Sequence, residues 1–168
     1  DKKIKEFCKY SKIPIINGLS PSSHPTQILS DVFTIEEIKK KPISKLNITW
    51  IGDCNNVLNS LIAASVKFSF KLNIGCPKNY KPKRFILNWV KKNKRKVNIF
   101  HDPRKAVKNA DVIFSDKVIS LNDHVDIRKK KKDFKKFYVD QKLLDKAKKN
   151  VIFLHCLPRG SEVSDKGF

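Results

Sequence analysis

The start of one predicted helix carries two side chains that could act on a carbonyl group. His24 and Gln27 open the segment HPTQILSDVFTIEEIKK (24–40), whose apolar spacing predicts a helix with His24 as its N-terminal cap. An imidazole and an amide beside the positive end of a helix can stabilise a developing oxyanion. A structural explanation competes, because Gln27 could reach back to the cap as in a capping box, and spacing alone favours that contact.

The segment GDCNN (52–56) follows a predicted strand and opens the next predicted helix. It is not a dinucleotide-binding fingerprint, because Cys54 and Val57 stand where that pattern needs glycine. The amides of Asn55 and Asn56 at a helix start could hold a carboxylate. Capping of the helix by Asp53 or by the asparagines explains the same residues without a ligand, and the spacing leaves both explanations open.

Two further polar groups end predicted strands. Asp116 ends the strand 111–116 and Ser120 follows it, so the carboxylate could bind an amine cation, although Asp is also common in strand-end turns. His155 and Cys156 end the strand 151–156. Adjacent strand residues point to opposite faces, which makes a direct Cys–His catalytic pair a poor geometry. A metal site would need further suitably spaced ligands, and a buried, inert Cys156 is the common alternative.

The remaining elements must bring these groups together. Apolar runs predict strands at 13–16, 46–52, 71–77, 96–100, 111–116 and 151–156. Helical patterns fall at 24–40, 55–69, 82–93, 103–109 and 140–150, and 117–139 is predicted to be a long loop. Apolar strands separated by helices are typical of a parallel sheet covered on both faces, so we predict a doubly wound α/β/α fold. Ligands bind such sheets at the carboxyl ends of the strands, where the polar groups described above stand.

Composition is typical of a globular protein and excludes few functions. The 168 residues are 40% hydrophobic and 32% charged, and no apolar run has the length needed to cross a bilayer. The net charge of +21 could indicate nucleic-acid binding, but only five of the 37 basic residues are Arg. The lysines, including the run RKKKKDFKK (128–136), are expected to form a solvated face, so nucleic acid is an unlikely partner.

The four cysteines show no metal-binding or disulfide spacing, which indicates a reducing compartment. The chain has no Met and begins at Asp1, so we expect a piece of a longer protein. The expected compartment is the cytoplasm, with the mitochondrial matrix as the alternative.

Four segments together resemble the ornithine carbamoyltransferase family, and the similarity runs through nearly the whole chain. They are INGLSPSSHPTQILSDVFTIEE, WIGDCNNVLNSL, ADVIFSD with its following Ser, and VDQKLLDKAKKNVIFLHCLPR. HPTQ is shared with aspartate carbamoyltransferases, whereas the Asn pair and HCLPR are typical of the ornithine branch. The resemblance implies transfer of a carbamoyl group from carbamoyl phosphate to L-ornithine, giving L-citrulline and phosphate, without a metal or organic cofactor. It implies a homotrimeric parent enzyme of arginine biosynthesis or the urea cycle.

The resemblance also assigns roles, matched position by position. His24 and Gln27 would contact and polarise the carbamoyl group, and Asn56, with Asn55 beside it, would hold the ornithine carboxylate. Asp116 and Ser120 would hold the α-amino end of ornithine, with Leu121 at the next contact position. Cys156 and the backbone of Leu157 would face the carbamoyl carbon and the δ-amine. Arg159 would complete the motif. The implied division is 1–41, the end of a carbamoyl-phosphate domain with the interdomain helix, and 42–168, an ornithine-binding domain.

The sequence departs from the family pattern in several places. It has no Ser-Thr-Arg-Thr phosphate-binding segment, and we expect the family's C-terminal helix to be missing. Val118, Leu121 and Asn122 replace the Trp, Met and Gly of the family's closing loop, and Cys54 replaces a Gly. We therefore expect little turnover by this chain alone. Two alternatives stay open: a carbamoyltransferase for another amine such as putrescine, and a non-catalytic basic binding module.

Overall fold

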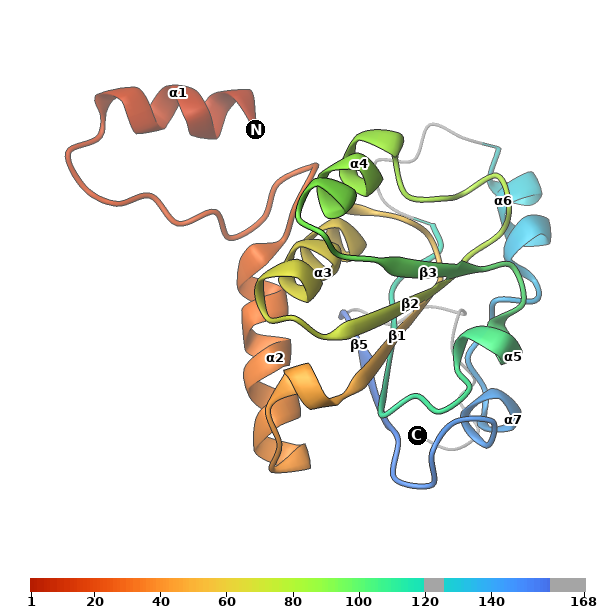
Figure 1. The fold of residues 1–168 in the computed structure, drawn as a ribbon. Coiled ribbons are helices and arrows are strands. Elements are labelled where there is room, and N and C mark those ends of the chain that lie inside the picture. Colours follow the sequence, from red (N-terminus) through yellow and green to blue (C-terminus); the bar gives the residue numbers. More distant parts are fainter. Residues whose placement is uncertain (120–125, 158–168) are drawn as a thin grey trace.

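The computed structural model describes residues 1–119 and 126–157, and its centre is one sheet of five parallel strands (Figure 1). The strands are β1 (Asn47–Ile51), β2 (Lys71–Gly75), β3 (Val97–Phe100), β4 (Val112–Ser115) and β5 (Ile152–His155). Their order is β3-β2-β1-β4-β5, and every neighbouring pair is parallel. The chain winds outward from β1 first to one edge and then to the other, which confirms the predicted doubly wound α/β fold.

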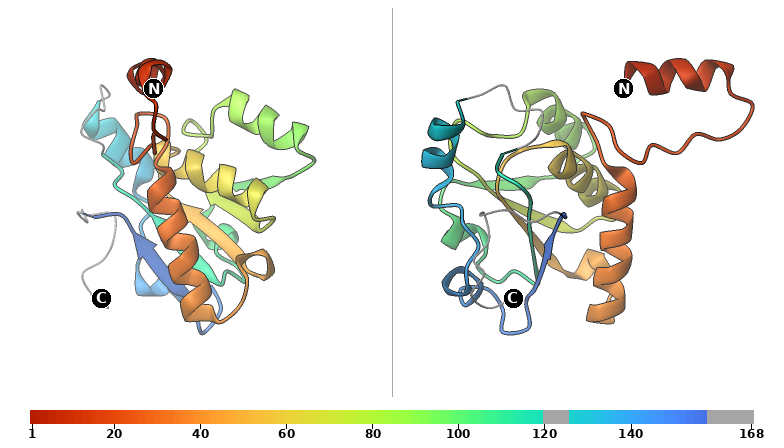
Figure 2. Two further views of the ribbon diagram at one scale, coloured as in Figure 1. Left: turned by 90° about the vertical axis from the view of Figure 1, so that its left-hand side faces the viewer. Right: turned by 180° about the vertical axis from the view of Figure 1, so that it is seen from behind.

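Helices cover both faces of this sheet (Figure 2). The helices are α1 (Lys2–Tyr10), α2 (Pro25–Lys39), α3 (Asn56–Lys67), α4 (Arg84–Lys92), α5 (Pro103–Ala106), α6 (Ile127–Phe134) and α7 (Gln141–Leu144), with a 3-10 turn at Ile43–Lys45. One buried cluster joins the sheet to α2, α3 and α4, and a second joins it to α5, α6 and α7. Successive strand residues serve the two faces: Trp50 belongs to the first cluster and Ile51 to the second.

The N-terminal segment differs from the prediction. Residues 13–16 form no strand: Ile13 and Ile16 are 75% and 81% exposed, and these residues pair with none of the strands of the described sheet. The helix α1, which the apolar pattern did not predict, precedes them and has no buried residue. Figures 1 and 2 show it standing apart from the sheet. This part of the chain therefore contributes nothing to the two cores.

The predicted loop 117–139 is wrong where α6 lies. Asp126 caps this helix, since its Oδ1 accepts hydrogen bonds from the backbone N–H groups of Arg128 and Lys129. The helix buries Phe134 together with Lys130, four residues earlier on the same face. Periodicity missed α6 because a lysine occupies one of the two buried positions.

Other boundaries shift by a few residues. The helix α7 is a single capped turn over Gln141–Leu144, much shorter than the predicted 140–150, because the chain continues in tight turns up to β5. In α2, the buried apolar positions are Ile28, Val32 and Ile35, and Asp31 is buried beside them. The apolar Leu29 and Phe33 of the same helix are exposed. None of the helices in the described part of the chain is both long and apolar enough to cross a membrane.

Gly75, the last residue of β2, lies in a closely packed part of the sheet. A Cβ atom at this position would lie 2.7 Å from the Cδ1 atom of Ile51 and 3.1 Å from the Cβ atom of Ala106. Both neighbours are fully buried, so neither can move away without disturbing the second core.

We therefore expect Gly75→Ala to lower the free energy of unfolding by about 1–3 kcal/mol, because it overpacks the core. Gly18→Ala is the matched control, because a Cβ there meets nothing within 4 Å. It should change the free energy by less than about 0.5 kcal/mol. Urea unfolding of the two variants measures the difference, and equal stabilities would show that the sheet tolerates the extra methyl.

Candidate active site at the carboxyl edge of the sheet

The turns that follow β1, β4 and β5 open at one edge of the sheet. Gly52 supplies the left-handed conformation that the turn after β1 needs, with φ of 139°. Cys54, which stands where the family has a Gly, is not among the described residues with positive φ, so its side chain introduces no strain of that kind. Interaction with the Cys76 thiol, followed by burial, raises the pKa of Cys54, and the same interaction lowers the pKa of Cys76.

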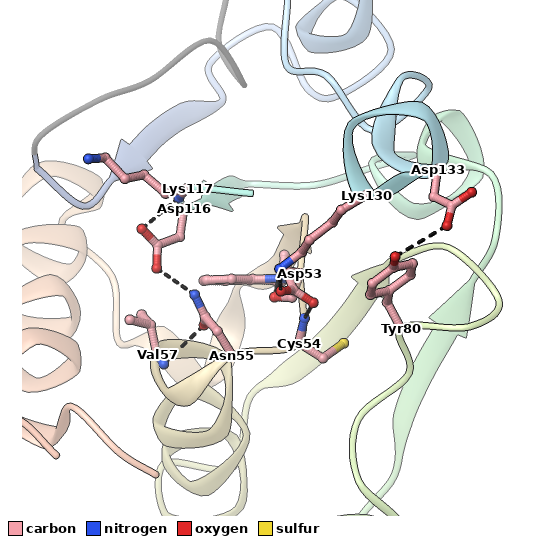
Figure 3. A network of polar contacts seen from close by, with 10 residues as sticks. Asp53, Cys54, Asn55, Val57, Tyr80, Asp116, Lys117, Lys130 and Asp133 are labelled. Atoms are coloured by element: carbon pink, nitrogen blue, oxygen red, sulfur yellow. Dashed lines mark hydrogen bonds and ion pairs between the residues drawn. The ribbon is translucent and has the colours of Figure 1, made fainter. Parts of the chain in front are cut away.

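Asn55 links two of these turns (Figure 3). It is the N-cap of α3: its Oδ1 accepts hydrogen bonds from the backbone N–H groups of Val57 and Leu58, both at 3.1 Å. Its Nδ2 remains available and donates to Asp116 Oδ2 at 2.6 Å. The other oxygen of Asp116 accepts from the N–H of Lys117 at 2.7 Å. Capping and site formation are thus two uses of one side chain.

The other members of GDCNN have different partners. Asn56 donates from Nδ2 to the Ser20 carbonyl at 3.0 Å, which ties α3 to the segment before α2. Asp53 does not cap the helix. Its Oδ1 accepts from the Cys54 N–H at 2.8 Å, and its Oδ2 lies 2.6 Å from Lys130 Nζ. The expectation of a solvated lysine face is therefore wrong at Lys130, which is 2% exposed.

The start of α2 lies beside α3. The His24 N–H donates to Ser60 Oγ at 2.8 Å, and His24 Nδ1 is buried with no hydrogen-bond partner in the part of the chain that the structure describes. Gln27 does not reach back to the cap, so the capping-box prediction is wrong. Its Nε2 donates instead to Asp31 Oδ1 at 3.0 Å, one helical turn further on.

Asp31 is a functional candidate that sequence reasoning missed. It is buried on α2, and this burial raises its pKa, while the Gln27 hydrogen bond and nearby His24 act in the opposite direction. The sequence offered one sign of it: an Asp stands among the positions that α2 buries, where charged residues are rare.

Cys156 lies near the carboxylates of Asp116 and Asp31. Burial, then the negative charges of Asp116 and Asp31, raise the pKa of the Cys156 thiol to about 12. The side chain packs against the first core, whereas Phe153 packs against the second. The His155 ring lies 6.2 Å from the ring of Phe153, so His155 and Cys156 diverge as predicted. Cys156 is a neutral thiol rather than a thiolate nucleophile.

The predicted site residues therefore fall into two groups. His24, Gln27, Asn55, Asn56, Asp116 and Cys156 occupy the edge formed by the turns and the start of α2, and Leu157 follows with an 87% exposed residue surface. Ser120, Leu121 and Arg159 lie outside the described residues. Within residues 1–119 and 126–157 there is no group of three His, Cys, Asp or Glu side chains that could hold a metal ion. The described groups can bind and orient polar substrates through amides, a carboxylate and a neutral thiol.

Comparison with protein families gives two matches that divide the chain. Residues 44–168 match the aspartate/ornithine carbamoyltransferase family, Asp/Orn binding domain. Residues 1–37 match the carbamoyl-P binding domain of the same family. These matches do not test the predicted boundary between 1–41 and 42–168.

Individual relatives agree with these matches. Ornithine carbamoyltransferases of Methanocorpusculum labreanum and Methanosarcina acetivorans are 45% and 41% identical, over 97% of this chain and 54% of each relative. The crystal structure of the anabolic ornithine carbamoyltransferase of Campylobacter jejuni superposes with a TM-score of 0.91 at 38% identity, covering 98% of this chain and 56% of that one. The Pyrococcus furiosus enzyme gives 0.87 at 37% identity, covering 98% and 54%. The chain thus spans about half the length of the relatives it matches.

The raised pKa of Cys156 predicts a thiol that resists alkylation. At pH 8 a pKa of about 12 leaves about one thiolate in ten thousand, so iodoacetamide should modify the exposed Cys8 long before Cys156. Asp116→Asn removes one of the negative charges, which should lower the pKa and speed modification of Cys156, tenfold for each unit of pKa.

Peptide mass spectrometry over a time course measures both rates. Asp145→Asn, on the exposed surface, is the matched control and should leave the Cys156 rate unchanged. Modification of Cys156 at the rate of Cys8 would contradict the neutral thiol.

Proposed function

Because the chain belongs to the aspartate/ornithine carbamoyltransferase family, we propose that it forms the ornithine-binding half of an ornithine carbamoyltransferase. The whole enzyme would transfer the carbamoyl group of carbamoyl phosphate to the δ-amine of L-ornithine and release L-citrulline and phosphate. The observation that carries this proposal is the 2.6 Å hydrogen bond from Asn55 to Asp116, which joins the two turns matched to the amino-acid-binding positions.

Recognition of the amino-acid end follows from these two turns. The Asp116 carboxylate can accept hydrogen bonds from the α-ammonium group of ornithine, and it is held in place by Asn55 and by the N–H of Lys117. The α-carboxylate would lie at the start of α3, where Asn55 and Asn56 stand and the helix dipole favours an anion. The two ends of the amino acid thus meet opposite charges a short distance apart.

The carbamoyl end would lie between α2 and β5. The buried His24 Nδ1 has no partner among the described residues, and Gln27 stands one turn along the same helix, so both can face a carbonyl oxygen. Polarising that oxygen stabilises the negative charge that develops when the δ-amine attacks the carbamoyl carbon. The amine must lose its proton to attack, and the neutral thiol of Cys156 with the backbone of Leu157 would line that position.

Turnover needs a phosphate site as well. The 168-residue sequence contains no Ser-Thr-Arg-Thr segment, so we propose that this chain alone binds ornithine but turns over little. The trimeric assembly, the role in arginine biosynthesis or the urea cycle, and the cytoplasmic or mitochondrial location stay predictions.

Calorimetric titration tests the proposed ligand with two partial analogues. L-ornithine should bind more tightly than putrescine, which lacks the carboxylate, and more tightly than 5-aminovalerate, which lacks the α-amino group. Asp116→Asn should weaken ornithine binding by about 10- to 100-fold, because it removes a charged hydrogen-bond partner. Asp145→Asn is the matched control and should bind normally.

Two further results would count against the proposal. Tighter binding of putrescine than of ornithine would favour the alternative amine acceptor. Absence of ornithine binding, combined with nucleic-acid affinity that survives about 0.15 M salt, would favour the basic binding module. A citrulline assay on this chain and on a longer protein that contains it measures turnover directly. Rapid turnover by the chain alone would contradict the proposal that it binds ornithine but turns over little.

A further inference from the structure

One lysine of the Lys-rich helix α6 is buried, and it lies beside the candidate site. Lys130 is 2% exposed, and its Nζ atom lies 2.6 Å from Asp53 Oδ2 (Figure 3). The same atom lies 6.0 Å from the centre of the Phe134 ring. Lys129 and Lys131, its neighbours in the chain, are exposed. Lys130 thus differs from its exposed neighbours in having a specific internal partner, and Lys131 can serve as a control.

The helix that carries Lys130 also contacts the loop after β2. Tyr80, in the loop after β2, donates a hydrogen bond from its hydroxyl to Asp133 at 3.2 Å. The Tyr80 ring also meets the Phe134 ring edge-on, with ring centres 4.7 Å apart. These contacts fix α6 against the carboxyl edge of the sheet, so the Lys130 ammonium group is a fixed point on which the turn after β1 can be anchored.

Asp53 carries this anchoring to the turn. Its Oδ2 meets Lys130, its Oδ1 accepts from the Cys54 N–H at 2.8 Å, and its carbonyl oxygen accepts from Trp50 Nε1 at 3.0 Å. Every polar group on this residue's carboxylate and carbonyl is therefore engaged. Asn55 lies only two residues after Asp53, so the position of its side-chain amide depends on how this turn is held.

Asn55 has little freedom to compensate if the turn shifts. Its Oδ1 is already used by two backbone N–H groups of α3, and its Nδ2 donates to Asp116 at 2.6 Å. Buried ion pairs contribute little net stability, because the cost of removing both charges from water offsets their attraction. Stability alone therefore gives a weak reason for a lysine here, whereas a directional tether between two turns gives a direct one.

We propose that Lys130 is a positioning residue that acts through Asp53 on the Asn55–Asp116 pair and thereby sets the affinity for the α-amino end of the substrate. The inference rests on the proposed function for its substrate, but the geometry it invokes can be observed without any ligand. Lys130 itself touches neither substrate nor reacting atoms in this arrangement.

The test compares three variants of the 168-residue chain. Lys130→Met leaves Asp53 as a buried, uncompensated charge and can unfold the protein, so the decisive variant is Asp53→Asn combined with Lys130→Met. That pair removes both charges and retains an oxygen for the Cys54 N–H. Lys131→Met, which removes an exposed charge from the same helix, is the matched control.

The first measurement is the side-chain amide signal of Asn55 in ¹H–¹⁵N NMR spectra without ligand. In the double variant we expect this signal to shift and its hydrogen exchange to accelerate, while thermal unfolding shows a folded protein and Lys131→Met leaves the signal unchanged. An unshifted Asn55 amide in the folded double variant would overturn the proposal.

The second measurement is calorimetric binding of L-ornithine. The double variant should bind about tenfold more weakly than the unmodified chain, and Lys131→Met should bind normally. Normal affinity in the double variant would show that Lys130 only neutralises Asp53, and would also overturn the proposal. If the unmodified chain binds no ornithine, the proposed function fails, and the Asn55 signal still decides whether Lys130 positions the amide.

Discussion

The strands β1, β4 and β5 run parallel and in register, and the candidate site depends on that pairing. Ile51 is paired with Ser115, and Ser115 with His155, so the three strands end at the same level. The turns that follow these three strands therefore lie side by side. This is why Asn55, Asp116 and Cys156, which are separated by up to 101 positions of sequence, from 55 to 156, can lie at one edge. The chemistry of the site is carried by turns, but their positions are set by the hydrogen bonding of the sheet.

Most of this arrangement can be predicted from apolar patterns, because the strands of a covered parallel sheet are apolar throughout. The predicted strands 46–52 and 111–116 contain β1 and β4, and the polar residues just beyond them are the ones that meet. Partners within the site are harder to predict: spacing favoured a contact between Gln27 and its helix cap, whereas in the fold Gln27 donates to Asp31. The prediction of a strand at 13–16 is wrong, because an apolar run forms a strand only where it can pair with a neighbouring strand.

Lys130 shows a second limit of sequence reasoning. A lysine within a run of lysines carries no periodic signal, and solvation of all of them is the expected result. Only the fold brings Asp53 within 2.6 Å of this one and Phe134 beneath it. The same holds for α6 as a whole, whose buried face combines a cation with an aromatic ring, a combination that hydrophobic patterns do not register.

The local charge of the site opposes the charge of the protein. The chain carries +21, yet burial and then the nearby negative charges of Asp116 and Asp31 raise the pKa of the Cys156 thiol, and Lys130 is paired with Asp53. Charges more than about 8 Å apart are largely screened at physiological salt, so the proposed cationic substrate would respond mainly to the carboxylates at the edge of the sheet.

The high pKa of Cys156 bears directly on the proposed reaction. A thiolate beside the δ-amine would stabilise the ammonium form, which cannot attack a carbonyl carbon. A neutral thiol would contact the δ-amine without placing a negative charge beside it. Asp116, meanwhile, is directed by Asn55 and by the N–H of Lys117, so its negative charge is available at the α-amino end. Burial, with the two carboxylates, can then keep the thiol protonated, while Asp116 would hold one end of the proposed substrate as a cation and the other end would be free to lose its proton.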